Sequence, residues 1–413
     1  MSDSASPPPA LLVITQVYPP DPAALGQHLA DVAEELVRRG WRVRVYTADR
    51  GYEDPSVRYA RQEVRGGVEI RRFRWSSFGK RSITIRLLAQ AIFMSQACVA
   101  AILRGRVSAI LASTSPPFAN FGAAVVARVR GAPLTWWVMD LNPDQMIAAG
   151  RIGSRSVPAR LFDAMNRVAL RASRSVIVLD RFMRDRVLAK AAVPDKVVVC
   201  PPWAAAEAAG SDDGAAFRRE HGLGDRFLVM YAGNHALQHP LTTLLDAAER
   251  LRDDPRIAFV FVGGGSGKAE VDARIAAGAP NVRSLPYQPL ERLADTLSAG
   301  NLHVVTMGDD MVGIVHPCKI YGVLAAGRPV LYFGPRHSHV GDILSAADIG
   351  WQVAHGDVAA AVAAIREAAA LPAERLASLG EAARRLAEHS YPRRGLVDAV
   401  CSRLAATARG TEG

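Results

Sequence analysis

The chain has 413 residues, of which 49% are hydrophobic and 22% are charged. This composition is typical of folded domains and excludes a wholly disordered chain, and the length predicts two domains. The 50 Lys and Arg residues outnumber the 40 Asp and Glu residues, which gives a net charge of +10. Such an excess favours an anionic partner, and three remain open at this point: nucleic acid, an acidic membrane surface and a phosphorylated small molecule.

The four cysteines are far apart along the chain and form no CxxC or Cys/His pattern: Cys98, Cys200, Cys318 and Cys401. They predict neither a disulfide framework nor a zinc site. The first nine residues are polar and rich in proline, without the basic and apolar regions of a secretory signal. We therefore expect a cytoplasmic protein.

The first half of the chain opens with the order strand, loop, helix, strand. Residues 11–15 (LLVIT) are a short apolar run that predicts a buried strand. After a proline-rich loop, apolar side chains recur at the spacing of one helical face from Leu29 to Val37. Gly40 suits the end of that helix, and residues 43–47 predict the next strand.

The second half alternates apolar runs with helical patterns. The predicted strands are residues 227–233, 257–263, 282–286, 302–307 and 329–334. The helical patterns between them are residues 241–251, 271–277, 290–297 and 319–326. Continuous apolar strands that alternate with helices predict a parallel sheet covered on both faces.

A stretch rich in Ala, Gly, Ser and Asp, residues 204–214, predicts a linker or surface insertion. We therefore expect two doubly wound α/β domains, residues 10–203 and 215–385, and a helix at 391–409 that either packs on the second domain or crosses back to the first. Both sheets are expected to turn the loops at their carboxyl ends toward a shared central cleft, where open α/β sheets bind ligands.

The first candidate site is the loop after residues 11–15. It contains Gly26, Gln27 and His28 and leads into a helix, whose free N–H groups favour an anion. An ordinary turn that needs glycine for its shape is the alternative interpretation.

The second candidate is the glycine run Gly263-Gly264-Gly265-Ser266-Gly267-Lys268, which follows a predicted strand. A P-loop would need glycine at Val262 and Ser or Thr at Ala269, so the run is not a Walker motif. It predicts a glycine turn near a nucleotide, or a tight turn without a ligand.

The densest candidate is the segment 311–330, MVGIVHPCKIYGVLAAGRPV. Gly313, His316 and Lys319 precede or begin a predicted helix. A lysine and a titratable histidine at a helix amino terminus favour a pyrophosphate. The alternative is a solvated lysine with a capping histidine.

Two further loops follow predicted strands. Asn234 and His239 lie after the first strand of the second domain, and Asp140 and Asp144 lie after a strand of the first domain. Carboxylates that follow an aromatic run at a sheet edge are candidates for a ligand site, although Asn-Pro-Asp is also an ordinary turn sequence.

Basic and aromatic residues alternate between Arg71 and Arg86, including Arg74-Trp75 and Phe78-Gly79-Lys80-Arg81. This patch favours contact with an inner membrane surface over nucleic acid. The apolar stretch 83–103 has the length to span a bilayer, but its polar residues and its place within an α/β domain predict a mostly buried helix instead.

These segments together resemble the family 4 glycosyltransferases, which are retaining enzymes of the GT-B fold. Residues 11–47 resemble the family's amino-terminal signature, and HPCKIYGVLAAGRPVLYFG resembles its Pro-Ser-Lys branch from capsule, O-antigen and exopolysaccharide clusters. The segments YAGNHALQHPLTTLLDAAERL, FVFVGGG and LPYQPLERL follow in the family's order. The resemblance covers nearly the whole chain, and it is the combination of motifs that is specific.

The resemblance implies a nucleotide-sugar donor in the second domain, an acceptor in the first, no metal and no cofactor besides the co-substrate. We expect catalytic roles for Asp140, His316 and Asp310. The expected donor and phosphate contacts are Gly26, Asn234, His239, Gly264, Gln288, Gly313 and Lys319, and the expected acceptor side is Gln27, His28 and Asp144.

The chain also departs from the family pattern. Asn234 and His239 stand where many members have Arg and Lys, and Asp140 stands where many have a histidine. The family's pair of glutamates falls on Asp310 and Cys318, or on Ile314 and Gly322, depending on the alignment frame.

We therefore expect a glycosyltransferase that acts with retention on a hydroxyl of a lipid-linked or polysaccharide intermediate at the inner membrane face, and does not bind nucleic acid. The alternatives are a soluble small-molecule acceptor, a nucleotide-sugar-binding protein without catalysis, and a sugar-nucleotide epimerase.

Overall fold

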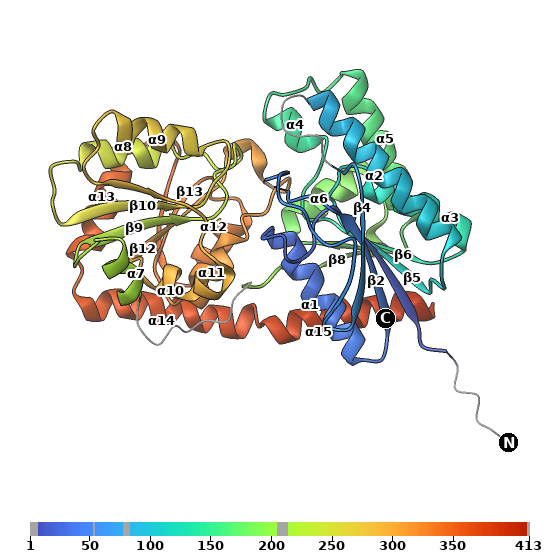
Figure 1. Ribbon diagram of the computed structural model, residues 1–413. Helices are drawn as coiled ribbons and strands as arrows, with labels where there is room; N and C mark the ends of the chain where they lie inside the picture. The colour runs from blue at the N-terminus through green and yellow to red at the C-terminus, as the bar shows by residue number, and fades with distance from the viewer. Residues whose placement is uncertain (1–6, 53, 77–82, 205–213, 411–413) are drawn as a thin grey trace. The chain divides into compact units, whose positions relative to one another are not determined.

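The computed structural model describes residues 7–52, 54–76, 83–204 and 214–410. The chain divides into two compact units (Figure 1). The amino-terminal unit comprises Met1–Pro201 and Arg394–Gly413, and the carboxyl-terminal unit comprises Pro202–Arg393. The predicted linker, residues 204–214, lies almost entirely outside the described residues.

The amino-terminal unit contains an eight-stranded sheet in the order β3-β4-β2-β1-β5-β6-β7-β8. All neighbouring strands pair in parallel except β3 and β4, which are antiparallel. The strands are β1 (Ala10–Ile14), β2 (Arg42–Ala48), β3 (Gln62–Arg65), β4 (Val68–Phe73), β5 (Ala109–Ala112), β6 (Leu134–Trp137), β7 (Ser175–Val178) and β8 (Val197–Val199). The strands predicted at residues 11–15 and 43–47 are confirmed as β1 and β2.

Helices cover both faces of this sheet. Connections from β1 to β2 and from β5 to β6 run in opposite directions along the sheet, so right-handed crossovers place their helices on opposite faces. The helices are α1 (Ala24–Arg38), α2 (Ile83–Leu103), α3 (Ala119–Arg130), α4 (Asp144–Ala148), α5 (Val157–Ala172), α6 (Arg181–Lys190), the short η1 (Pro194–Lys196) and α15 (Arg393–Arg409). The predicted helical face of Leu29, Val32 and Leu36 is buried in α1.

The last helix, α15, packs with the amino-terminal unit. Its side chains Val397, Val400 and Leu404 are buried. The Cys401 thiol lies 3.6 Å from the carbonyl oxygen of Val32 in α1. Helix α15 therefore covers the same face of the sheet as α1.

Helix α2 corrects one expectation from the sequence. The helix predicted at residues 83–103 is present, but it is buried on one side only. Phe93 and Ala97 are in the core, whereas Leu88 and Leu103 are 58% and 75% exposed. Among the described helices, none combines the length and apolarity needed to cross a membrane.

The carboxyl-terminal unit contains a six-stranded parallel sheet in the order β11-β10-β9-β12-β13-β14. Its strands are β9 (Phe227–Ala232), β10 (Ile257–Val262), β11 (Val282–Leu285), β12 (Leu302–Thr306), β13 (Val330–Phe333) and β14 (Gly350–Val353). All five strands predicted in this half are confirmed, so both units have the predicted Rossmann-like architecture.

The helices of this unit bury both faces of the sheet. They are α7 (Ala215–Glu220), α8 (Thr242–Arg250), α9 (Lys268–Ala276), the short η2 (Leu290–Arg292), α10 (Leu293–Ser298), the short η3 (Asp309–Met311), α11 (Lys319–Ala325), α12 (His339–Ala346), α13 (Val358–Ala370) and α14 (Ala373–Ser390). Along β9, Val229 and Tyr231 belong to one hydrophobic cluster and Leu228 and Met230 to another. This two-sided burial explains why the strand reads as a continuous apolar run.

The prediction of a basic and aromatic surface patch between Arg71 and Arg86 is also wrong in part, because one of its arginines is buried. Arg72 lies in β4 and is buried, with its guanidinium 2.8 Å from Glu63 and donating to the carbonyl oxygens of Pro19 and Ala60. It is therefore a structural residue of the sheet. Arg74 and Trp75 are exposed, and the predicted Phe78-Gly79-Lys80-Arg81 segment lies outside the described residues.

Candidate active site

The candidate donor residues lie in loops at one edge of the carboxyl-terminal sheet. Because β9 to β13 are all parallel, the loops that follow their carboxyl ends meet at the same edge. These loops contain Asn234, His239, Gly264 and Gln288. The loop after β12 leads through Gly313 to Lys319.

Lys319 is the first residue of α11, and its side chain lies over the loop that follows β9. Gly233, in that loop, has a φ angle of +125°, and a Cβ atom on it would come within 2.7 Å of Lys319 Cε. Lys319 Nζ is 5.1 Å from the centroid of the Tyr231 ring. The side chain thus crosses the loop at a position that only glycine leaves open.

The Lys319 ammonium group is poorly solvated. Burial lowers the pKa of Lys319 to about 8, because desolvation penalises the charged form. The described residues give it no carboxylate partner. A half-buried cation whose neighbours are an aromatic face and backbone is suited to bind an anion.

His239 lies near this lysine but does not add a positive charge. Its Nδ1 is 2.7 Å from the carbonyl oxygen of Thr306 at the end of β12, so Nδ1–H donates and Nε2 retains its lone pair. Desolvation, with the charge of Lys319 as a smaller cause, lowers the pKa of His239 to about 3. The imidazole is therefore neutral at physiological pH.

Asn234 is exposed immediately after Gly233, and its backbone is fixed by the strand it follows. The Tyr231 hydroxyl donates to the Asn234 carbonyl oxygen at 2.7 Å. Of the two positions at which the family has Arg and Lys, this chain thus presents one exposed amide and one neutral imidazole.

His235 joins the loops after β9 and β10, a role that the sequence did not reveal. Its backbone N–H donates to the Gly264 carbonyl oxygen at 2.7 Å, and its carbonyl accepts from the Gly267 N–H at 2.6 Å. The ring is fully buried against Tyr231, with the ring centroids 5.0 Å apart. Desolvation lowers its pKa to about 4, so this ring is a neutral part of the core.

The glycine run 263–267 closes the other side of this edge. Gly263 has a φ angle of +130°, and a Cβ there would lie 2.1 Å from the Gly233 carbonyl oxygen, so the two loops touch through their backbones. Lys268 Nζ donates to the carbonyl oxygens of Gly263 and Leu285, at 2.7 and 2.9 Å. Lys268 therefore ties the ends of β10 and β11 together.

Gln288 and Tyr287 follow β11 beside this run. The Tyr287 hydroxyl donates to the Gly264 carbonyl oxygen at 3.3 Å, and the residue is 42% exposed. Gln288 Nε2 donates to the Pro286 carbonyl oxygen at 3.1 Å. The exposed Tyr287 ring thus stands next to Gly264, and the half-buried Gln288 follows it in the chain.

The loop after β12 holds two further candidates. Asp310 lies in η3 and is exposed, next to the exposed Asp309. Gly313 is buried and has a φ angle of +70°, so it supplies a turn on the way to α11. Helix α11 itself is a short helix that starts at Lys319.

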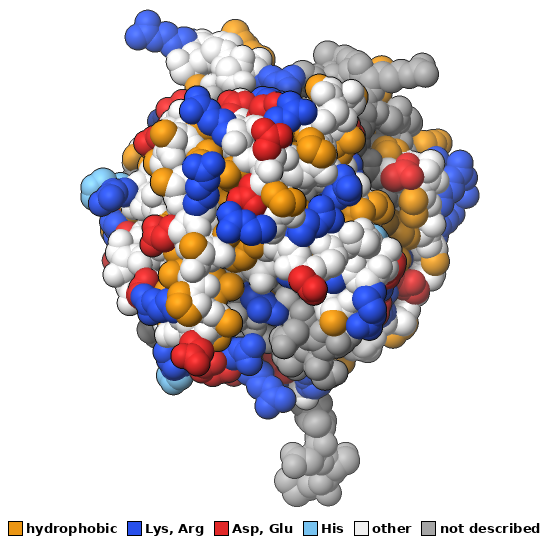
Figure 2. All heavy atoms as spheres, turned by 90° about the vertical axis from the view of Figure 1, so that its left-hand side faces the viewer, with side chains coloured by type: hydrophobic (Ala, Val, Ile, Leu, Met, Phe, Trp, Pro, Cys, Tyr) orange, Lys and Arg blue, Asp and Glu red, His pale blue; other side chains and the backbone are white. Residues whose placement is uncertain are grey.

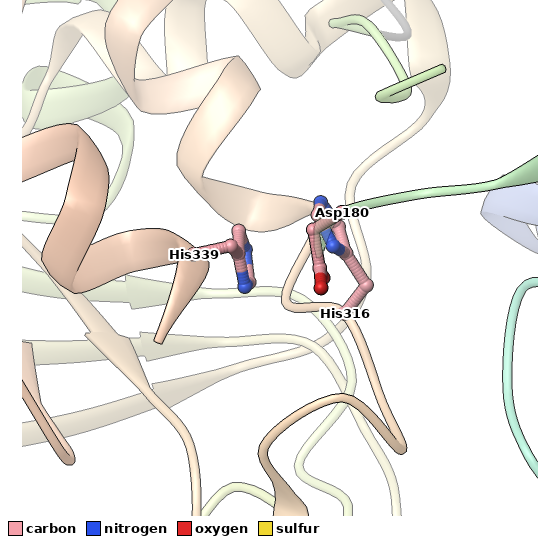
Figure 3. Close-up of side chains that lie close together, drawn as sticks. All are labelled: Asp180, His316 and His339. Atoms are coloured by element: carbon pink, nitrogen blue, oxygen red, sulfur yellow. The ribbon is translucent and has the colours of Figure 1, made fainter. Parts of the chain in front are cut away.

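His316 lies only three positions before Lys319, but the two side chains contact different residues. Its Nε2 is 2.8 Å from the Tyr321 hydroxyl, and its ring stacks on His339, the first residue of α12, with centroids 3.6 Å apart (Figure 3). Asp180, the third residue labelled in Figure 3, belongs to the amino-terminal unit, where its carboxylate accepts from the Met183 N–H and caps α6.

In the amino-terminal unit, Asp140 follows β6. Desolvation raises the pKa of its carboxyl group to about 6. A carboxyl group with a raised pKa at the carboxyl edge of an α/β sheet is a candidate for contact with a substrate. Asp144, by contrast, forms an ion pair with Lys190 at 2.7 Å, and Lys190 also contacts Asp163 at 2.7 Å.

Gly26, Gln27 and His28 lie in the first turns of α1. A Cβ on Gly26 would come within 3.2 Å of the Tyr18 Cα, so this glycine lets the helix approach the preceding loop. Gln27 Nε2 donates to the Asp21 carbonyl oxygen at 3.2 Å, and His28 is buried. The predicted loop therefore ends at Ala23, the N-cap of α1, and these three residues belong to the helix rather than to the loop.

Two family models match the chain. The model described as "Glycosyl transferase 4-like domain" matches residues 24–203, and the model described as "Glycosyl transferases group 1" matches residues 214–386. The chain therefore belongs to the family 4 glycosyltransferases of the GT-B fold, as its motifs predicted, and is a glycosyltransferase.

Individual proteins similar to the chain agree with this family. WcaI of Escherichia coli K12, a glycosyl transferase named for colanic acid biosynthesis, is 27% identical over 382 residues, 88% of this chain and 92% of that protein. The solved structure of Anabaena HepE with UDP and glucose has a TM-score of 0.72 at 15% identity and covers 96% of this chain and 99% of that one. WaaG, from lipopolysaccharide biosynthesis, has a TM-score of 0.70 at 13% identity, with coverages of 96% and 99%.

Proposed function

We propose that the chain transfers a sugar, with retention and without a metal ion, from a nucleoside-diphosphate sugar to a hydroxyl of a lipid-linked or polysaccharide intermediate at the cytoplasmic face of the membrane. The observation that carries the donor part is the position of Lys319 over Gly233, without a carboxylate partner among the described residues. The similarity to HepE, whose structure contains UDP and glucose, supports a nucleotide donor.

Lys319 is proposed to bind the diphosphate. Lys268, the other lysine at this edge, is engaged by two carbonyl oxygens, so of these two lysines Lys319 is the one available to an anion. Gly233 and Gly264 have no side chains, so a phosphate can approach the backbone of their loops. One charge-assisted contact is worth about 1.5–3 kcal/mol, or roughly tenfold to a hundredfold in affinity.

The remaining donor contacts surround this lysine. Asn234 is proposed to donate its side-chain amide to a phosphate oxygen, and His239 to contact the donor through its free Nε2. Tyr287, which borders Gly264, and its neighbour Gln288 are proposed to contact the base. Asp310 is proposed to accept hydrogen bonds from the hydroxyls of the donor sugar, in place of the family's glutamate.

The loops of the amino-terminal unit are proposed to bind the acceptor. The carboxylate of Asp140 would accept a hydrogen bond from the reacting hydroxyl or from one beside it, and its raised pKa marks it as poorly solvated. Gln27 and His28 would shape the acceptor side. Asp144 would act through its ion pair with Lys190, by fixing the start of α4 below Asp140.

Retention is proposed to follow from front-face attack, in which the acceptor oxygen forms its bond to the anomeric carbon on the side that the diphosphate leaves. The leaving phosphate oxygen then takes the acceptor proton, so that no protein nucleophile is needed. Lys319 stabilises the charge that develops on the leaving diphosphate. His316, hydrogen-bonded to Tyr321 and stacked on His339, holds the loop that leads to this lysine.

The proposal is tested with purified protein in two stages. A thermal-shift screen with UDP-, GDP-, ADP- and dTDP-sugars identifies the donor, and transfer is then measured on a lipid-linked acceptor and on a soluble alcohol. The anomeric configuration of the product is read by NMR, with and without EDTA. Retention and full activity in EDTA are expected; inversion or loss of activity in EDTA would contradict the mechanism.

The other outcomes separate the alternatives. Transfer to the soluble alcohol but not to the lipid-linked sugar would favour a small-molecule acceptor. Tight nucleotide binding with no transfer and no hydrolysis would indicate a binding protein. Formation of a new sugar nucleotide in the absence of an acceptor would indicate an epimerase.

A further inference from the structure

We propose that the outer surface of helices α2, α3 and α5 is a docking face for a bilayer rich in anionic lipid. This inference deepens the membrane-linked acceptor of the proposed function, but it concerns a surface of the amino-terminal unit and requires no catalysis. It extends the membrane contact from the Arg71–Arg86 stretch, in which Arg72 is buried, to a whole layer of helices.

The three helices form one continuous layer. Helix α3 packs against α2 on one side and against α5 on the other (Figure 1). All three follow strands of one parallel sheet and connect in the same direction along it, from β4 to β5, β5 to β6 and β6 to β7. Right-handed crossovers therefore place them on the same face of the sheet.

The outer surface of this layer is unusually apolar. Helix α2 exposes Ile85, Leu88, Val99 and Leu103, which fall on one stripe because their spacings follow the helical period. Helix α3 adds Val125 and Val129, and helix α5 adds Val157, Leu161 and Val168. Together, the three helices carry nine of the eighteen large hydrophobic side chains that are exposed in the described part of the chain.

The described α-helices of the carboxyl-terminal unit do not form a comparable apolar layer. They expose one large hydrophobic side chain, Ile275 in α9. On the face drawn in Figure 2, Lys and Arg side chains are interspersed with Asp and Glu. An exposed apolar surface that is concentrated on one layer marks an interaction site rather than chance exposure.

The charge of the layer is almost entirely positive. The sequences of α2, α3 and α5 contain six arginines and one acidic residue, Asp163, which pairs with Arg167 and Lys190. Arg128 and Arg160 are exposed and have no ion-pair partner among the described residues. Apolar side chains interleaved with arginines suit the boundary between anionic headgroups and acyl chains.

One edge of the layer has the features of a headgroup site. An open hollow of about 410 Å³ lies between β4 and α2, with Arg61, Arg71 and Arg104 beside the apolar side chains of Val99 and Leu103. Trp75 is 64% exposed, and the carbonyl oxygen of its neighbour Arg74 accepts from Gln96 of α2 at 2.8 Å. An exposed tryptophan held against this helix suits the membrane interface, where Trp is enriched.

The same charges disfavour a second copy of the chain as the occupant. Two such faces brought together would oppose arginines to arginines, with only Asp163 to offset them, and like charges placed across an interface are repulsive. A bilayer with anionic lipid instead provides the opposite charge and an apolar interior together. The lipid surface is therefore the occupant that both observations favour.

The experiment is co-sedimentation of the full chain, without nucleotide, with vesicles of phosphatidylethanolamine and phosphatidylglycerol or of phosphatidylcholine alone. Binding to the anionic vesicles that weakens with added salt is expected. The double variant Leu88→Gln/Leu161→Gln should reduce the partition coefficient at least tenfold, because two apolar side chains no longer insert. Ile275→Gln, the matched change outside the layer, should leave it unchanged.

A second pair of variants tests the charges without altering any apolar contact. Arg128→Gln/Arg160→Gln should lower binding to the anionic vesicles by about fivefold per charge. Arg283→Gln, an exposed arginine on β11, is the control and should have no effect. Because all these side chains are exposed, thermal melting should be unchanged.

Equal binding of the wild type and both double variants, or no binding of folded protein to any vesicle, would overturn the proposal. A dimer in analytical ultracentrifugation that Leu88→Gln/Leu161→Gln converts to a monomer would assign the face to a second copy instead. Vesicle binding by a chain with no transferase activity would contradict only the proposed function. Activity on a soluble acceptor without vesicle binding would contradict only the docking face.

Discussion

Lys319 reaches across the backbone of Gly233, so that a β-carbon on this glycine would lie 2.7 Å from Lys319 Cε. The lysine begins α11 and the glycine follows β9, far apart in the sequence. The missing side chain of Gly233 is what allows an ammonium group to lie over this loop. The proposed diphosphate contact therefore depends on both residues, which can be tested separately.

Gly233→Ala is expected to weaken donor binding by about tenfold or more, because the new methyl group displaces the Lys319 side chain from its position. It should also lower the free energy of unfolding by about 1 kcal/mol, since alanine is strained at a φ angle of +125°. Isothermal titration calorimetry with the donor and thermal melting measure the two effects.

Gly278→Ala distinguishes the effect of backbone strain from the effect of displacing the Lys319 side chain. Gly278 has a φ angle of +85°, and a Cβ there would meet nothing within 4 Å. This variant should lose comparable stability but keep its donor affinity. Equal affinity losses in the two variants would show that Lys319 is not the residue that Gly233 accommodates.

Donor affinity should depend on pH through Lys319. Its pKa is lowered to about 8, so the fraction of charged ammonium in the free protein falls as the pH rises through 8. The dissociation constant of the donor should be nearly constant below pH 7 and rise by up to tenfold per pH unit above 8. In Lys319→Arg, which stays charged, this rise should disappear; an unchanged profile would exclude Lys319 as its source.

Lys319→Met should stabilise the fold while weakening donor binding. Burial lowers the pKa of Lys319 from 10.5 to about 8, so the folded state binds fewer protons than the unfolded state between these two pH values. The buried charge therefore lowers the free energy of unfolding by its full amount below pH 8. At pH 7, methionine should raise the free energy of unfolding by about 1 kcal/mol. The gain should shrink between pH 8 and 10.5 in denaturant titrations, and a pH-independent gain would point to packing alone.

Asp140→Asn should lower kcat/KM for the acceptor at least a hundredfold and leave the donor dissociation constant unchanged. The pKa of Asp140 is raised to about 6, so its carboxylate forms as the pH rises through 6, and the wild-type rate should rise over the same range. The variant should lack this rise. Asp185→Asn, an exposed aspartate of the same unit, should match the wild type.

Asp310→Ala should raise the KM for the donor sugar about tenfold with little change in the affinity for the free nucleoside diphosphate, because only the sugar hydroxyls lose a partner. Asp309→Ala is the matched control, since both aspartates are exposed in η3. Equal effects would indicate a general loss of negative charge, and loss of diphosphate binding would place Asp310 elsewhere in the site.

The repeating architecture was predictable because it depends on short-range patterns. The apolar run 257–263 and the helical spacing of Leu29, Val32 and Leu36 depend on burial and on periods of a few residues, and both were recovered in the structure. The motifs that identify the family also lie within short segments. Local sequence was therefore enough for the fold and for the class of enzyme.

The partners of individual side chains were not predictable in this way. Lys319 and His316 are neighbours in the sequence, yet Lys319 contacts Tyr231 and Gly233, whereas His316 contacts Tyr321 and His339. Arg72 lies in a basic stretch of the sequence that predicts a surface patch, yet its side chain is buried. These outcomes depend on segments that the fold brings together from distant parts of the chain.

By itself, the sequence determined two parallel α/β units, the glycosyltransferase family and an excess of ten positive charges. The tertiary structure decided where those charges act. It pairs Lys190 with Asp144, holds Lys268 on two carbonyl oxygens and leaves Lys319 available over Gly233. The physical reason is that net charge is a sum over residues, whereas the availability of a charge depends on which groups the fold places within hydrogen-bonding distance of it.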